Sequence, residues 1–150
     1  MAKNKIEHEI VIAQPVEQVW AVLTDAGFLG RWFGNGEPVE IDLRPGGRIL
    51  FDHGSHGSLP AVLEQVEAPS GLSFRWSQGD AGTDPTPENS TLVEFSVSEE
   101  SAGGSRLRAV ESGFATMDFP EETRSDRYDV NNAGWIRKLQ ELREFLDQTS

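Results

Sequence analysis

Hydrophobic residues recur at helical spacing near both ends of the chain and at every second position between them. The first apolar stripe consists of Val16, Val19, Trp20 and Leu23. This spacing predicts an amphipathic helix that begins at Pro15, because the missing N–H of proline costs nothing in a first turn. The sequence breaks this helix at 24–27, and helical spacing returns over 28–33, which predicts a second, short helix.

The last segment predicts one long helix, from about Val130 to Gln148, or about 28 Å at the usual rise per residue. Its apolar face holds Trp135, Leu139, Leu142 and Leu146, with Ile136 and Phe145 beside them. The stretch from Gly113 to Asp129 is acidic and shows no clear period, so we expect an irregular segment before the helix.

Between the helical segments the apolar period is two, which predicts strands. The expected strands cover 7–12, 39–43, 48–53, 58–67, 72–77, 91–98 and 106–112. Short turns such as 44–47, Arg-Pro-Gly-Gly, join neighbouring strands and favour an antiparallel sheet. Residues 79–89 are polar and predict an exposed loop. The pattern indicates an α+β fold with helices on one face of the sheet, in a single domain over 1–150.

Composition removes several classes of function. The 150 residues include no cysteine, which excludes disulfides and thiolate metal sites, and the formal net charge is -12. Such a charge repels phosphate backbones and anionic lipid surfaces, so we expect neither nucleic acid nor membrane as a partner. We see no signal peptide and no apolar run of the roughly 18–20 residues that a membrane span needs. We therefore expect a cytoplasmic protein.

Five short motifs, in this order, resemble a known family. They are 15–20 (Pro-Val-Glu-Gln-Val-Trp), 31–33 (Arg-Trp-Phe), 42–48 (Asp-Leu-Arg-Pro-Gly-Gly-Arg), 110–114 (Val-Glu-Ser-Gly-Phe) and 134–135 (Gly-Trp). Together they resemble the activator of heat-shock protein 90 ATPase homologue-like family of the START-like, helix-grip superfamily, also called SRPBCC or Bet v 1-like. The resemblance spans about residues 6 to 146.

The resemblance implies a fold and a range of functions. The fold is a curved, seven-stranded antiparallel sheet wrapped around the C-terminal helix, with a cavity between them. Members of the superfamily bind lipids, hormones, polyketides or other apolar molecules, and some cyclise or hydrolyse them. The eukaryotic co-chaperone of the family resembles this chain in its C-terminal domain only.

Standard catalytic motifs are absent from the sequence. There is no Gly-x-Ser-x-Gly elbow, and Gly46-Gly47 lies in a hairpin turn rather than in a phosphate-binding loop. His53 and His56 are three residues apart, which on a helix would suit a metal ion, but here the segment leaves a strand for a Gly/Ser loop. We predict no metal site, no cofactor and no assigned catalytic residue.

Two polar residues have two open interpretations. Glu111 shares a strand face with Leu107 and Ala109, and His53 shares one with Ile49 and Phe51. Both side chains would then point into the cavity, where burial would raise the pKa of Glu111 and His53 could share its proton. Alternatively, both residues lie at the rim, in contact with water or the backbone.

An aromatic set either forms an ordinary core or lines a ligand pocket, and we interpret Trp20 and Trp135 as packing anchors. The expected ligand-binding residues are Trp32, Phe33, Phe51, His53, Phe74, Trp76, Phe95, Glu111, Phe114 and Leu139. The leading hypothesis is the binding of a small hydrophobic molecule. The alternatives are a chaperone-associated protein of the stress response, and a cyclase or hydrolase that uses Glu111 and His53. A chaperone and a second copy of the chain are the candidate protein partners.

Overall fold

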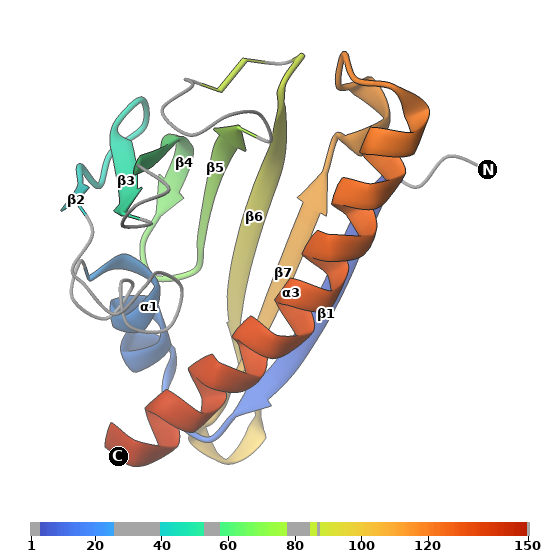
Figure 1. Ribbon diagram of the computed structural model, residues 1–150. Coiled ribbons are helices and arrows are strands. Elements are labelled where there is room, and N and C mark those ends of the chain that lie inside the picture. The colour runs from blue at the N-terminus through green and yellow to red at the C-terminus, as the bar shows by residue number, and fades with distance from the viewer. Residues whose placement is uncertain (1–3, 26–39, 53–57, 78–84, 87, 150) are drawn as a thin grey trace.

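The computed structural model describes residues 4–25, 40–52, 58–77, 85–86 and 88–149 (Figure 1). Its strands are β1 Lys5–Ile12, β2 Glu40–Ile41, β3 Arg48–Asp52, β4 Ser58–Glu67, β5 Gly71–Ser77, β6 Ser90–Glu99 and β7 Ser105–Ser112. Its helices are α1 Val16–Thr24, α3 Glu121–Thr149 and the single turns η2 Ser101–Gly103 and η3 Phe114–Thr116. The second helix expected over 28–33 and most of the loop expected over 79–89 lie outside the described residues.

All seven strands form one antiparallel sheet in the order β1-β7-β6-β5-β4-β3-β2. The curved sheet carries α3 across one face, in front of β7 and β1 in Figure 1, and α1 lies at one end of the same face. This arrangement confirms the α+β, helix-grip fold that the hydrophobic pattern and the resemblance predicted. Even the 29-residue α3 lacks the apolar stretch that a bilayer crossing requires, and the same holds for the other described helices.

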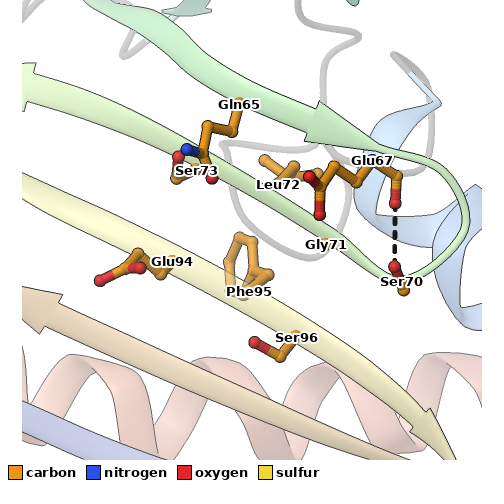
Figure 2. Close-up of a pocket in the computed structure, with 9 residues that line it drawn as sticks. All are labelled: Gln65, Glu67, Ser70, Gly71, Leu72, Ser73, Glu94, Phe95 and Ser96. Carbon is orange, nitrogen blue, oxygen red and sulfur yellow. Dashed lines mark hydrogen bonds between the residues drawn. The ribbon is translucent and has the colours of Figure 1, made fainter.

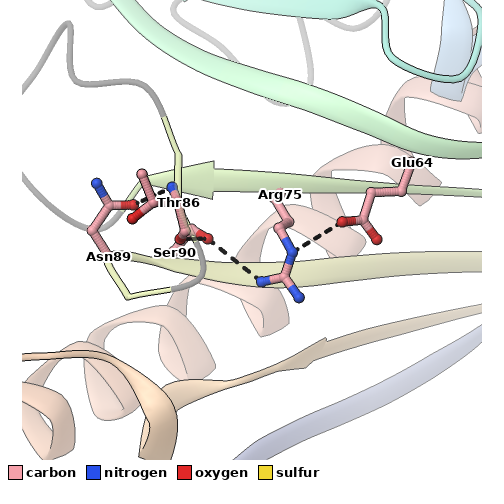
Figure 3. A network of polar contacts seen from close by, with 5 residues as sticks. All are labelled: Glu64, Arg75, Thr86, Asn89 and Ser90. Atoms are coloured by element: carbon pink, nitrogen blue, oxygen red, sulfur yellow. Dashed lines mark hydrogen bonds and ion pairs between the residues drawn. The ribbon is translucent and has the colours of Figure 1, made fainter.

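Strand alternation separates a buried face from a polar face. On β5, Leu72 and Phe74 are buried in the hydrophobic core, and they pair in register with Phe95 and Val93 on β6. Arg75 points to the outer face, where its guanidinium donates to Glu64 over 3.0 Å and to Ser90 Oγ over 3.5 Å (Figure 3). The outer face is therefore held by polar contacts, and the inner face carries the core.

The turn between β2 and β3 needs glycine. The N–H of Gly47 donates to the carbonyl of Arg44 over 2.9 Å, and a Cβ at Gly47 would lie 2.0 Å from the carbonyl oxygen of Asp42. No side chain fits at that distance. The turn also docks on β4, because Leu63 N donates to Gly47 O over 2.8 Å and Gly46 N donates to Leu63 O over 2.8 Å.

The long helix begins at Glu121, so the prediction of a start near Val130 was wrong. Its first turn carries two acids, Glu121 and Glu122, which complement the helix dipole, and Arg124 N donates to Pro120 O over 3.0 Å. Residues 121–129 contain almost no apolar side chain, so the hydrophobic pattern gave no signal for this part of the helix.

The buried face of α3 agrees with its predicted face in most positions. Trp135, Leu139, Leu142 and Leu146 are all buried, as expected. Ile136, which we placed beside them, is 55% exposed, because it follows Trp135 by about 100° around the helix axis. Tyr128 fixes the helix along β1 by donating its hydroxyl to the carbonyl of Lys5 over 2.9 Å.

Candidate functional site

Glu111 is a buried carboxyl group on the inner face of the sheet. It sits near the end of β7, where it pairs in register with Ile6 on β1 and Val93 on β6. Strand alternation places it on the face of Leu107 and Ala109, and the residue is 1% exposed. Glu111 is therefore not a solvated rim residue, and its side chain points inward, while its role in ligand binding stays a prediction.

Four side chains donate hydrogen bonds to this carboxyl group. Oε1 accepts from Trp135 Nε1 over 2.8 Å and from Asn131 Nδ2 over 3.3 Å. Oε2 accepts from Trp76 Nε1 over 2.8 Å, from Thr91 Oγ1 over 2.5 Å and from Asn131 Nδ2 over 3.1 Å. The contacts fill the roughly four lone-pair sites that two carboxylate oxygens offer.

The donors come from three separate elements, and the fold explains why they converge. Trp76 on β5 and Thr91 on β6 are directly paired across the two strands, and the indole N–H also lies 3.1 Å from the Thr91 hydroxyl. Asn131 and Trp135 are four residues apart, so one turn of α3 presents both on neighbouring parts of its inner face. Glu111 thus links α3 to the middle of the sheet.

The two tryptophans that bind this group belong to a closed series of four aromatic contacts, which we call the aromatic cluster of Phe74, Trp76, Phe95 and Trp135. Phe74 and Trp76 meet edge to face with centroids 5.6 Å apart, and Trp76 lies 6.2 Å from Trp135. Trp135 meets Phe95 edge to face at 5.7 Å, and Phe95 lies 6.0 Å from Phe74. Such pairs contribute about 0.5–1.5 kcal/mol each beyond the area that they bury.

Burial controls the protonation of Glu111. Loss of water raises the pKa of this carboxyl group above its ordinary value, and the hydrogen bonds from Thr91, Trp135, Trp76 and Asn131 oppose that rise. No ion pair within the described part of the chain involves Glu111. The carboxyl group is therefore held by neutral donors there, without a positive charge beside it.

The structure brings together four of the predicted ligand-binding residues, namely Phe74, Trp76, Phe95 and Glu111. Leu139 is 1% exposed and follows Trp135 by one turn on the buried face of α3. Phe114 is fully buried in η3, where it meets Tyr128 edge to face at 5.3 Å.

The remaining predicted residues cannot be placed in the site. Phe51 has a described backbone only, which pairs with Leu59 between β3 and β4. Trp32, Phe33 and His53 lie outside the described residues, as does His56 of the histidine pair that we weighed as a metal site. Among the residues described, no group of three or more His, Asp or Glu side chains is arranged to hold a metal ion.

Three of the four donors, Thr91, Asn131 and Trp135, were not among the predicted ligand-binding residues. Asn131 carried no signal, because it lay in a polar stretch at the expected start of the helix. Trp135 was interpreted as a packing anchor, yet a buried indole N–H needs an acceptor, and Glu111 was the one carboxyl group predicted to face inward. That requirement was the available signal for their contact.

A separate pocket of about 290 Å³ lies on the outer face of the sheet (Figure 2). It is lined by Gln65, Glu67, Ser70, Gly71, Leu72, Ser73, Glu94, Phe95 and Ser96. Gln65, Ser73 and Glu94 are neighbours across β4, β5 and β6 and alternate with the inward row. The pocket is mostly polar and opens away from Glu111, so it differs from the cavity that the sequence led us to expect.

Several solved structures share this fold. Protein MLL2253 from Mesorhizobium loti is 22% identical, with a TM-score of 0.78 over 97% of this chain and 98% of that one. CalU16 from Micromonospora echinospora is 24% identical, with a TM-score of 0.69 over 94% of this chain and 74% of that one. The Aha1 dimer from Colwellia psychrerythraea is 19% identical, with a TM-score of 0.71 over 95% of each chain. At these identities the likeness shows the fold alone.

The sequence itself places the chain in a family. No curated protein matches it. Residues 13–147, which include α1, the sheet from β2 to β7 and nearly all of α3, match the family described as activator of Hsp90 ATPase homolog 1-like protein. The order of the elements, the sheet topology and this match agree with the resemblance of the five sequence motifs. The chain therefore belongs to the activator of Hsp90 ATPase homolog 1-like family.

Proposed function

We propose that this protein binds a small apolar molecule between the sheet and α3, beside Glu111 and the aromatic cluster. The observation that carries the proposal is the buried carboxyl group of Glu111, which neutral donors hold at 1% exposure. A carboxyl group in such a place lowers the stability of the empty protein relative to an apolar residue of similar size. A role in recognising a ligand accounts for a group that stability alone does not favour.

The surroundings of Glu111 support the same function. Ligand pockets combine an apolar, aromatic wall with a few placed polar groups. Here the aromatic cluster would form the wall, and the polar groups would be Glu111, Thr91 and Asn131. The helix-grip fold adds support, because it lays one long helix across the concave face on which these groups lie.

Decan-1-ol tests the proposal as a neutral apolar probe. Thermal unfolding is followed with and without the probe, and native mass spectrometry counts bound molecules. A ligand that binds only the folded state stabilises it by an amount that grows with the logarithm of its concentration relative to Kd, so we expect the melting temperature to rise with probe concentration and one molecule to bind per chain. An unchanged melting temperature together with no bound probe would contradict the proposal.

Two variants of neighbouring residues locate the bound probe. Phe74→Leu removes ring contacts to Trp76 and Phe95 on the inner face, and we expect it to weaken probe binding. Arg75→Ala removes the outer-face contact to Glu64, and we expect it to leave probe binding unchanged. Each shift is measured against the variant's own melting temperature without probe. Equal weakening by both variants would argue against a site on the inner face.

A second candidate function is an interaction with a chaperone. It rests on the family match and on the likeness to the Colwellia psychrerythraea Aha1 dimer. A direct test mixes the protein with purified Hsp90 and measures complex formation and ATPase rate, while light scattering of the protein alone reports whether it forms a dimer. A stimulated ATPase rate would support this function. The absence of both a complex and a change in the ATPase rate would contradict it.

A further inference from the structure

We propose that the ligand is an apolar amine, whose protonated nitrogen binds Glu111 at the position that the Asn131 amide now occupies. The proposal rests on the proposed function and names the chemical class of the ligand. Four steps support it: the replaceable position of Asn131, the space beside Gly134, the missing positive charge and the aromatic surroundings.

Asn131 is the donor that a ligand can replace. Its Nδ2 lies 3.1 Å and 3.3 Å from the two Glu111 oxygens, whereas the indole nitrogens of Trp76 and Trp135 lie 2.8 Å away. Longer hydrogen bonds are weaker. Asn131 on α3 is also half-buried, as is Trp76 on the sheet, while Thr91 and Trp135 are buried. A donor that approaches along the helix flank therefore meets Asn131 first.

The helix leaves space on this flank. Gly134 follows Asn131 by three residues, so the two lie on adjacent turns of the same side of α3. A Cβ placed on Gly134 would meet no described atom within 4 Å. Glycine inside a helix is less stable than alanine, so its presence here is not explained by helix stability. The missing side chain leaves room next to the amide that covers Glu111.

Charge favours an amine over other polar groups. Glu111 forms no ion pair with any Lys, Arg or His that the structure describes, so an ammonium group would supply the charge that its present donors lack. Hydrogen bonds to an ionised partner are about twice as strong as neutral ones. The net charge of -12 also attracts cations to the protein and repels carboxylates.

The aromatic cluster suits the hydrocarbon body of such a ligand. A hydrocarbon body that enters beside the carboxyl group would contact the half-buried Trp76 and then the buried rings of Phe74, Phe95 and Trp135. Aromatic rings also attract a cation that lies within about 6 Å of a ring centroid, and tryptophan does so most strongly. A carboxylate next to several aromatic side chains is a combination that recognises an ammonium group on an apolar body.

Three probes with the same chain length test the proposal: decylamine, decan-1-ol and decanoate, each below the concentration at which it self-associates. Isothermal titration near neutral pH gives a Kd for each. We expect decylamine to bind at least about tenfold more tightly than decan-1-ol, since a charged hydrogen bond exceeds a neutral one, and decanoate to bind most weakly. Glu111→Gln should bring the amine and alcohol affinities close together, and Arg75→Ala should leave their ratio unchanged.

A second variant keeps the test informative if Glu111→Gln does not fold. Asn131→Ala removes the competing amide, so we expect it to increase decylamine affinity by a few-fold. Equal binding of amine and alcohol to the parent protein would overturn the amine proposal and leave the proposed function intact. Binding of none of the three probes would overturn both. An amine preference that persists in a folded Glu111→Gln variant would overturn the role of Glu111.

Discussion

Trp135 and Glu111 connect the long helix to the sheet through one buried hydrogen bond. The indole Nε1 of Trp135 on α3 donates to Oε1 of Glu111 on β7 over 2.8 Å, and both residues are almost fully buried. A bond of this kind has few alternatives in a core, because any shift of the helix would leave a donor and a carboxyl oxygen without partners. The contact therefore fixes the position of α3 along the sheet.

Trp135→Phe should show how much this contact contributes. The substitution keeps an aromatic ring but removes the indole N–H, and we expect the free energy of unfolding to fall by about 1–3 kcal/mol. Trp20→Phe on α1 is the control, because the described residues provide no hydrogen-bond acceptor for that indole. Urea denaturation of both variants gives the comparison. An equal loss in the two variants would mean that ring volume, and not the hydrogen bond, explains the effect.

Glu111→Gln should change the pH dependence of stability. Burial raises the pKa of Glu111 in the folded protein, so the folded state holds its proton more tightly than the unfolded chain. The wild-type protein then loses free energy of unfolding as pH rises from the unfolded pKa, about 4.3, through the higher folded pKa. The glutamine amide of the variant does not titrate, so we expect the variant to gain stability relative to wild type between acid and neutral pH.

Denaturation of both proteins at several pH values measures that difference directly. Using the difference removes the shared contribution of the other acidic residues. If the variant instead lost stability relative to wild type as pH rises, the folded pKa of Glu111 would be lowered, and the hydrogen bonds to its carboxylate, or a positive charge beside it, would outweigh the loss of water.

Substitution with alanine should lower the stability of the protein at Leu139, on the buried face of α3, but not at the next residue. Leu139 is 1% exposed, and truncation to alanine should cost about 2–5 kcal/mol through lost burial and a remaining cavity. Gln140 is exposed, and Gln140→Ala should stay within about 0.5 kcal/mol of wild type. Similar melting temperatures for the two variants would contradict the packing of α3 on the sheet.

Two glycines should respond to alanine in opposite directions. Gly134→Ala adds a methyl group that meets no described atom and removes a flexible residue from a helix, so the empty protein should gain about 0.5–1 kcal/mol. Gly47→Ala places a methyl group 2.0 Å from the Asp42 carbonyl oxygen in the hairpin turn, so it should destabilise the protein. Thermal melts of both variants check the pair, and a loss of stability in Gly134→Ala would show that the flank of α3 is occupied.

The sequence predicted the sheet better than it predicted the helices. Strand alternation placed Phe74, Phe95 and Glu111 on the inner face correctly, because a period of two leaves only two faces to choose from. The first nine residues of α3 were missed, since they contact few core residues and so need no apolar face. Pro120 and the acids after it were the local signals for that helix start.

The candidate site was predictable only in part. The sequence indicated which side chains point inward, but the contact between Glu111 and Trp135 depends on where α3 crosses the sheet. That crossing is a tertiary property, set by packing between segments 24 residues apart in the chain. The role of Asn131 depends on the same crossing, and a single polar residue in a polar stretch gives no sign of it.

The most direct test of ligand binding beside Glu111 follows the indole N–H signals in a ¹⁵N-labelled sample. The chain has four tryptophans, so four such signals are expected, and single Trp→Phe variants assign them. On titration with decan-1-ol, we expect the signals of Trp76 and Trp135 to move and saturate together, while that of Trp20 stays in place. If the Trp76 and Trp135 signals stay fixed at concentrations where the probe binds the protein, the ligand site does not lie at Glu111.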